Sequence, residues 1–234
     1  MRNGLIPTFE EWVAYCFTQG YADFNARSDS PDYDAALARS DRFAVIPVDV
    51  LGGYLIRLLH APAFIADQYT DDQIGDGTWY LFGVGSSYFS EVFARGRLPQ
   101  DVQIKCMSEV ATIYLELYDH VCCKRGKDPE GEFINSLNVD VAVYMIWDMD
   151  SIEGAVMRVR GTPHLVEPGL HVLETILCGC RTSSCLASAL HGLGHIHGVH
   201  PRRTEQIIDA FLADRMIPDW LRLYALWARK GSVL

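Results

Sequence analysis

Residues 99–121 of the chain, PQDVQIKCMSEVATIYLELYDHV, carry the clearest structural signal in the sequence. Apolar side chains recur there at steps of four, three, four and four, at Cys106, Val110, Ile113, Leu117 and Val121. This spacing follows the turn of an α-helix and places these side chains on one face. Pro99 suits the first turn, because a helix start leaves its N–H groups unpaired in any case. The stretch therefore predicts an amphipathic helix over residues 99–124.

Similar signals recur along the rest of the chain. Prolines precede other apolar periodic runs, and two Thr-x-x-Glu/Gln segments, Thr8 with Glu11 and Thr70 with Gln73, have capping-box spacing. They predict further helices over residues 8–19, 47–61, 70–83, 86–95, 137–149, 151–158, 169–179, 182–197, 201–214 and 218–230. No run alternates apolar and polar residues between hairpin turns, so no strand is predicted.

The predicted fold class is therefore all-α, with a single domain over residues 1–234. About ten or eleven helices would stack as an irregular HEAT-like array, an α-solenoid, in which neighbouring helix pairs bury each other's apolar faces. Three stretches are predicted as loops because they are charged or are broken by Gly and Pro: residues 20–42, 124–134 and 158–168.

Composition limits the classes of partner. The chain has 20 basic and 30 acidic residues and a net charge of −10. An acidic surface repels nucleic-acid backbones and anionic membranes and favours a basic protein partner. The N-terminal MRNGLIPTFEEW lacks the apolar core of a signal peptide, and charged residues and prolines interrupt the most apolar region, residues 45–66. Seven cysteines scattered through predicted helices indicate buried free thiols, so we expect a cytoplasmic protein.

A histidine- and cysteine-rich segment, SSCLASALHGLGHIHGVHP at residues 183–201, allows two interpretations. Cys178, Cys180, Cys185, His191 and His195 have the atoms that zinc prefers, but not the paired ligand spacing of a structural zinc site. The alternative is a packing contact between helices. Ser188, Gly192 and Gly194 would let another helix approach, and the two histidines would hydrogen-bond carbonyls at the ends of neighbouring helices. This second interpretation is favoured, so neither a metal ion nor another cofactor is predicted.

Two groups of carboxylates stand beside predicted turns. Asp148, Asp150 and Glu153 follow an apolar run, and Asp71, Asp72 and Asp76 open the predicted helix over residues 70–83. Paired carboxylates can perform acid–base chemistry or hold a divalent ion, but they also cap helices. Capping is favoured for the first group, with Asp150 or Ser151 as the N-cap. Both groups are candidate contacts for a basic partner.

Three segments resemble a bacterial family of helical-repeat proteins for which no reaction is established. They are DQIGDGTWYLF, AVYMIWDMD, and CLASALHGLGH followed by IIDAFL and LRLYALWARKGSVL. The matching residues are Tyr144, Met145, Trp147 and Asp148, then Ser188 to His195, whereas Ile146 and Ile196 stand where the family pattern has aromatic residues. The resemblance covers roughly residues 45–234 and implies HEAT-type repeats and an interaction role.

No nucleophile or phosphate-binding motif is present in the sequence, so a non-catalytic binding protein is the first functional hypothesis. In its most concrete form this is a bacterial immunity protein that neutralises a basic toxin through an acidic surface. Two alternatives stay open. One is a metal-dependent enzyme that uses His191 and His195, with Asp148 as a third candidate, and the other is a helical scaffold.

Overall fold

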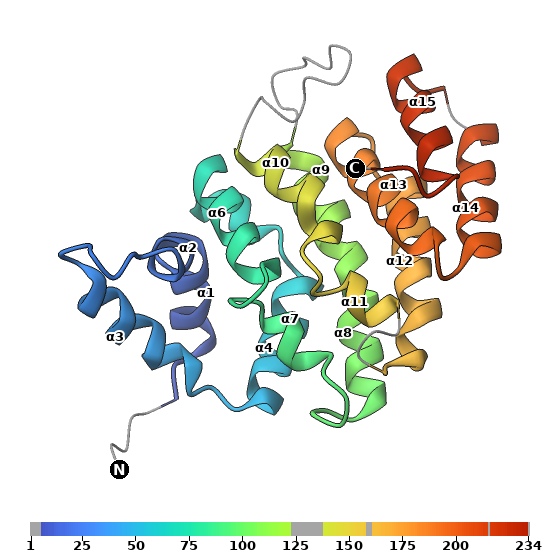
Figure 1. Cartoon of the computed structure of the whole chain (residues 1–234). Coiled ribbons are helices and arrows are strands. Elements are labelled where there is room, and N and C mark those ends of the chain that lie inside the picture. Colours follow the sequence, from blue (N-terminus) through green and yellow to red (C-terminus); the bar gives the residue numbers. More distant parts are fainter. Residues whose placement is uncertain (1–5, 123–137, 158–160, 215, 234) are drawn as a thin grey trace.

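The computed structural model describes residues 6–122, 138–157, 161–214 and 216–233. Within these ranges the regular structure consists of helices, and no strand occurs (Figure 1). The predicted all-α fold class is therefore confirmed. The loop predicted over residues 124–134 lies outside the described residues.

The helices follow one another closely along the chain. The first half contains α1 (Phe9–Thr18), α2 (Gly20–Phe24), α3 (Tyr33–Ala44), α4 (Val48–His60), α5 (Phe64–Gln68), α6 (Asp71–Phe82), α7 (Tyr88–Val92) and α8 (Gln100–Ile113). A π-helical turn (Tyr114–Tyr118) continues α8 into α9 (Asp119–Val121). The second half contains α10 (Asn138–Met145), a 3-10 turn (Ile146–Asp148), α11 (Glu153–Val156), a second 3-10 turn (Pro163–Leu165), α12 (Val166–Gly179), α13 (Ser183–His197), α14 (Pro201–Asp214) and α15 (Asp219–Ala228).

The longer helices pack in two layers that advance from the N-terminal to the C-terminal side of the molecule (Figure 1). In one layer α6 packs between α1 and α10, and α13 packs between α10 and α15. In the other layer α8 packs between α4 and α12, and α12 also contacts α14. Helix lengths range from three residues in α9 to fifteen in α13, so a regular HEAT-like repeat stays a prediction.

The local signals that predict helices are present in the structure. Thr8 caps α1 and Thr70 caps α6, each within a complete capping box. Helix α8 packs between α4 and α12. The apolar stripe of the quoted stretch is buried along its whole length: Cys106, Val110, Ile113, Leu117 and Val121. Burial of such a stripe is the main source of stability for a helix in a folded protein.

The loop predicted over residues 20–42 is wrong, because α2 and most of α3 fall within it. This stretch has few apolar residues, but Ala36 within it and Phe43 directly after it lie two turns apart on α3, and both are buried. The Phe43 ring stacks on Tyr15 of α1, with 4.1 Å between the ring centroids. Arg39 also donates two hydrogen bonds to the buried Asp23 carboxylate, at 2.6 and 2.9 Å. Tertiary contacts thus stabilise α3, which the polar composition of its residues does not predict.

We expect Arg39→Ala to lower the melting temperature by several degrees, because it leaves the Asp23 carboxylate, only 2% exposed, without its bidentate partner. Arg27→Ala is the matched control, since Arg27 forms a similar two-residue pair with Asp29 in which both side chains are largely exposed. Thermal melting followed by circular dichroism measures both variants. Equal melting temperatures for the two variants would contradict the anchoring of α3 through Asp23.

The loop predicted over residues 158–168 is also only partly correct. The second 3-10 turn starts at Pro163 and α12 starts at Val166, three residues before the predicted helix. Pro168 does not prevent this start, because the first turn of a helix tolerates proline. Among the described residues no single helix is long and apolar enough to cross a membrane; α3 and α4 pass that test only as a pair, and they are bent by 93°.

Candidate functional site

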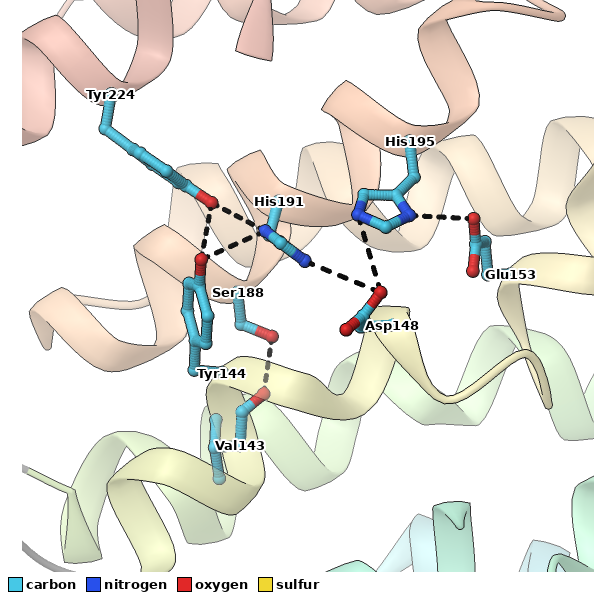
Figure 2. A network of polar contacts seen from close by, with 8 residues as sticks. All are labelled: Val143, Tyr144, Asp148, Glu153, Ser188, His191, His195 and Tyr224. Atoms are coloured by element: carbon cyan, nitrogen blue, oxygen red, sulfur yellow. Dashed lines mark hydrogen bonds and ion pairs between the residues drawn. The ribbon is translucent and has the colours of Figure 1, made fainter. Parts of the chain in front are cut away.

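The best-defined polar cluster lies where α13 packs between α10 and α15 (Figure 2). Helix α13 contributes Ser188, His191 and His195, whose spacing of three and four residues places them on one face. Tyr144 comes from the end of α10, and Asp148 from the 3-10 turn that follows it. The spacing along the helix thus places both histidines opposite the chain segment that carries the aspartate.

Small residues on α13 allow this close packing. A Cβ atom on Gly192 would lie 2.7 Å from Cγ of Trp147, and one on Gly194 would lie 2.5 Å from Cγ2 of Val233. Both distances are shorter than a van der Waals contact. Ser188 is fully buried and donates a 2.6 Å hydrogen bond to the carbonyl of Val143. These contacts agree with the predicted packing role of Ser188, Gly192 and Gly194.

His191 is buried, with 1% of its surface exposed, and its two ring nitrogens differ. Nδ1 lies 2.6 Å from the Tyr224 hydroxyl and 3.1 Å from the Tyr144 hydroxyl. Nε2 makes no hydrogen bond with any described residue. Burial and, to a smaller extent, the charge of the neighbouring His195 lower the pKa of His191 to about 4. His191 is therefore neutral at physiological pH.

His195 is partly exposed and lies between two carboxylates (Figure 2). Its Nδ1 is 3.1 Å from Oε1 of Glu153, and its Nε2 is 3.6 Å from Oδ1 of Asp148. The hydrogen bond with Glu153, followed by attraction to Glu153 and Asp148, outweighs burial and raises the pKa of His195. The same Asp148 oxygen is 4.0 Å from His191 Nε2, so both histidines face one carboxylate.

Two predictions for these residues are wrong. The histidines do not hydrogen-bond carbonyls at helix ends but contact side chains of tyrosine, aspartate and glutamate. Asp148, Asp150 and Ser151 are not helix caps: α11 starts after Ile152 without a side-chain cap, and the Ser151 hydroxyl donates to the Phe82 carbonyl. Asp150 occupies the left-handed region at φ 58°. Instead, the 3-10 turn after α10 directs Asp148 towards α13.

The cysteines do not join the histidines. Among the described residues, the groups of side chains that could hold a metal ion are Asp148 with His191 and His195, and separately Asp119 with Cys180 and Cys185. In the second group, one Asp119 oxygen accepts hydrogen bonds from the backbone N–H groups of Arg181 and Thr182, both at 2.7 Å. Burial raises the pKa of the Cys185 thiol. The Asp119 carboxylate thus binds backbone N–H groups immediately before the first residue of α13.

The second predicted group of carboxylates lies elsewhere. Asp71 and Asp72 occupy the first turn of α6, where the helix dipole favours negative charge, and Asp72 is exposed. Asp76, one turn further, accepts a 2.8 Å hydrogen bond from Asn138 at the start of α10. Asp148 follows the opposite end of α10, on the order of 15 Å away at 1.5 Å per residue. The two groups of carboxylates therefore form separate patches.

Two features of the site have no signal in the short-range sequence pattern. The Tyr224 hydroxyl, together with that of Tyr144, contacts His191 Nδ1. In the sequence, Tyr224 is indistinguishable from the other large residues of the last predicted helix. Glu153 binds His195 although the sequence places it beside Asp150 as a surface acid.

A cavity of about 520 Å³ lies elsewhere in the molecule and is lined by residues such as Phe43, Tyr80 and Glu91. Its Tyr80 and Tyr88 hydroxyls bond to each other at 2.9 Å.

Comparison of the chain with protein-family models, curated proteins and solved structures finds no match. The resemblance to a bacterial helical-repeat family therefore stays a prediction, and function is argued from the geometry.

Proposed function

We propose that this chain is a cytoplasmic protein-binding module that holds a basic protein partner, in its most concrete form an immunity protein that neutralises a bacterial toxin. The observation that carries the proposal is the acidic patch at the start of α6. Asp71, Asp72 and Asp76 lie within two helical turns, in the helix layer that runs from α1 to α15. A chain of net charge −10 supports such a role, because complementary charge accelerates association and selects among partners.

The carboxylates beside the histidines contribute less to this proposal than the sequence alone indicates. Glu153 is 13% exposed and contacts His195, and Asp148, although 38% exposed, faces both histidines, so these two carboxylates already have partners within the chain. Asp150 stays exposed beside them. The binding proposal therefore rests on the α6 patch, which lies at the other end of α10 from the histidines.

The test is a double charge reversal, Asp71→Lys with Asp72→Lys. The probe is the product of the neighbouring gene, purified in a catalytically inactive form, and the readout is its association rate at several salt concentrations. We expect slower association with rising salt, since the Debye length is about 8 Å at physiological ionic strength, and at least tenfold weaker binding by the variant. Co-expression with the active partner measures loss of growth protection in parallel.

The matched control is Asp32→Lys with Asp34→Lys, a pair of exposed acids at the start of α3. Each double variant exchanges two charges of −1 for two of +1, so both change the net charge from −10 to −6. A local contact weakens binding only in the α6 variant, whereas general steering weakens it equally in both. Binding that neither salt nor the α6 variant alters would refute the proposal.

A further inference from the structure

Three ligand atoms, two from α13 and one from the 3-10 turn after α10, converge in one place (Figure 2). Oδ1 of Asp148 lies 4.0 Å from His191 Nε2 and 3.6 Å from His195 Nε2, and one ligand atom from each residue lies within 4.8 Å of the others. In a tetrahedral zinc site with bonds of about 2.0–2.2 Å, neighbouring ligand atoms stand about 3.4 Å apart. The Asp148 and His195 atoms already stand close to that separation, and the Asp148 and His191 atoms need to approach each other by about 0.6 Å.

His191 Nε2, which faces the Asp148 carboxylate, is a buried polar atom without a hydrogen-bond partner among the described residues. His191 is 1% exposed, and its Nε2 makes no hydrogen bond with any described residue. Burial of a polar atom without a hydrogen bond is unfavourable, so native proteins rarely leave one unsatisfied. Nδ1 of the same ring is occupied by the Tyr224 hydroxyl, which leaves Nε2 as the coordinating atom.

The opposite ring nitrogens have the partners that metal-binding histidines use. A ligating imidazole donates its second N–H to a carboxylate or another acceptor, which orients the ring and increases its basicity. Glu153 is that acceptor for His195, 3.1 Å from Nδ1. The Tyr224 hydroxyl has the same position for His191, 2.6 Å from Nδ1, and bonds in turn to the Tyr144 hydroxyl at 2.8 Å. Both Nε2 atoms thus face Asp148.

We propose that His191, His195 and Asp148 form a binding site for a first-row transition-metal dication of the zinc type. Two imidazole nitrogens and one carboxylate oxygen suit such an ion, whereas Ca²⁺ and Mg²⁺ prefer sites made wholly of oxygen ligands. Asp148 and His195 are 38% and 23% exposed, so solvent reaches one side of the site. Three protein ligands with an open fourth position is the arrangement that lets a metal ion bind a water or a partner's side chain.

The competing explanation is a purely ionic contact, in which a protonated His195 is held between Asp148 and Glu153. That arrangement satisfies His195 but leaves Nε2 of His191 buried without a hydrogen bond. The two explanations differ in what the protein does with added zinc, because an imidazolium cannot coordinate a cation.

The experiment is a calorimetric titration of the full chain with ZnCl₂ after dialysis against a chelator. We expect one ion per chain, with at least tenfold weaker binding by Asp148→Asn and by His195→Gln, and 10–100-fold weaker binding by Glu153→Gln, which removes the charge behind the ligand. Asp150→Asn is the matched control: it changes an exposed acid two residues from Asp148, asparagine tolerates its positive φ, and zinc affinity stays unchanged. Unfolding midpoints of the metal-free variants check that each one folds.

A Co²⁺ titration identifies the ligands independently. Nitrogen and oxygen ligands give only ligand-field bands, whereas binding at Cys180 and Cys185 adds an intense thiolate charge-transfer band. One ion per chain without that band supports the proposal. A thiolate band, an absence of saturable zinc binding, or equal affinity in Asp148→Asn, His195→Gln and the original chain overturns it. These outcomes do not bear on the proposed partner, whose test uses Asp71 and Asp72 at the other end of α10.

Discussion

Gly192→Leu should destabilise the protein by at least about 3 kcal/mol, the upper end of the usual cost of overpacking. The added Cβ alone would stand 2.7 Å from Cγ and 2.9 Å from Cβ of Trp147. Trp147 is fully buried, so its indole has no space into which it can retreat. Gly192→Ala already introduces this clash and should show a smaller loss of the same sign. Urea denaturation monitored by circular dichroism measures the free energy of unfolding.

The matched control is Gly198→Ala, six residues further along at the end of α13. An added Cβ there meets nothing within 4 Å, and its backbone has the helical φ of −56° and ψ of −25°. Alanine should therefore leave stability unchanged or increase it by less than about 1 kcal/mol. If Gly192→Leu unfolded at the same urea concentration as Gly198→Ala, the close contact between α13 and Trp147 would be refuted.

Trp147→Ala should cost about 3–5 kcal/mol, the range for removing a fully buried aromatic side chain. The indole lies between the end of α10 and α13, and its removal opens a cavity that the backbone of α13 can fill only in part. Trp227→Ala on α15 is the matched control, because 48% of that tryptophan is exposed. This variant should lose clearly less free energy of unfolding than Trp147→Ala. Unfolding midpoints in urea again supply the measurement.

The double variant Gly192→Leu with Trp147→Ala tests the contact between the two residues directly. The leucine side chain enters the volume that the indole vacates, so the combined loss should be smaller than the sum of the single losses by about 0.5–3 kcal/mol. Additive losses would show that the two residues do not share a packing contact, and would place the source of the overpacking elsewhere on α13.

The packing of this segment sets the geometry of the proposed metal site. Gly192 and Trp147 lie on the apolar side of the contact between α10 and α13, while His195 and Asp148 lie at its partly exposed edge. Asp148 follows Trp147 directly, so the tryptophan that fixes the turn also fixes the position of the carboxylate. This arrangement gives a physical reason for small residues next to the histidines: they bring the turn close enough for Asp148 to reach both imidazoles.

Local periodicity was sufficient to predict the fold class and most helices. The stripe from Cys106 to Val121 and the two capping boxes depend on residues three or four apart, and the α-helix brings such residues together wherever it forms. The same rule places His191 and His195 on one face of α13. It did not identify α3, because the hydrogen bonds between Arg39 and Asp23 join residues sixteen apart.

Only the tertiary structure decided the chemistry of the candidate site. His191 and His195 are equivalent in the sequence pattern, yet one is buried between two tyrosines and the other lies between two carboxylates. Their partners Tyr224, Asp148 and Glu153 are 33, 47 and 42 residues away along the chain. A side chain's charge state and free ligand atoms depend on which groups and how much water surround it, and these follow from packing between distant segments rather than from spacing along one helix.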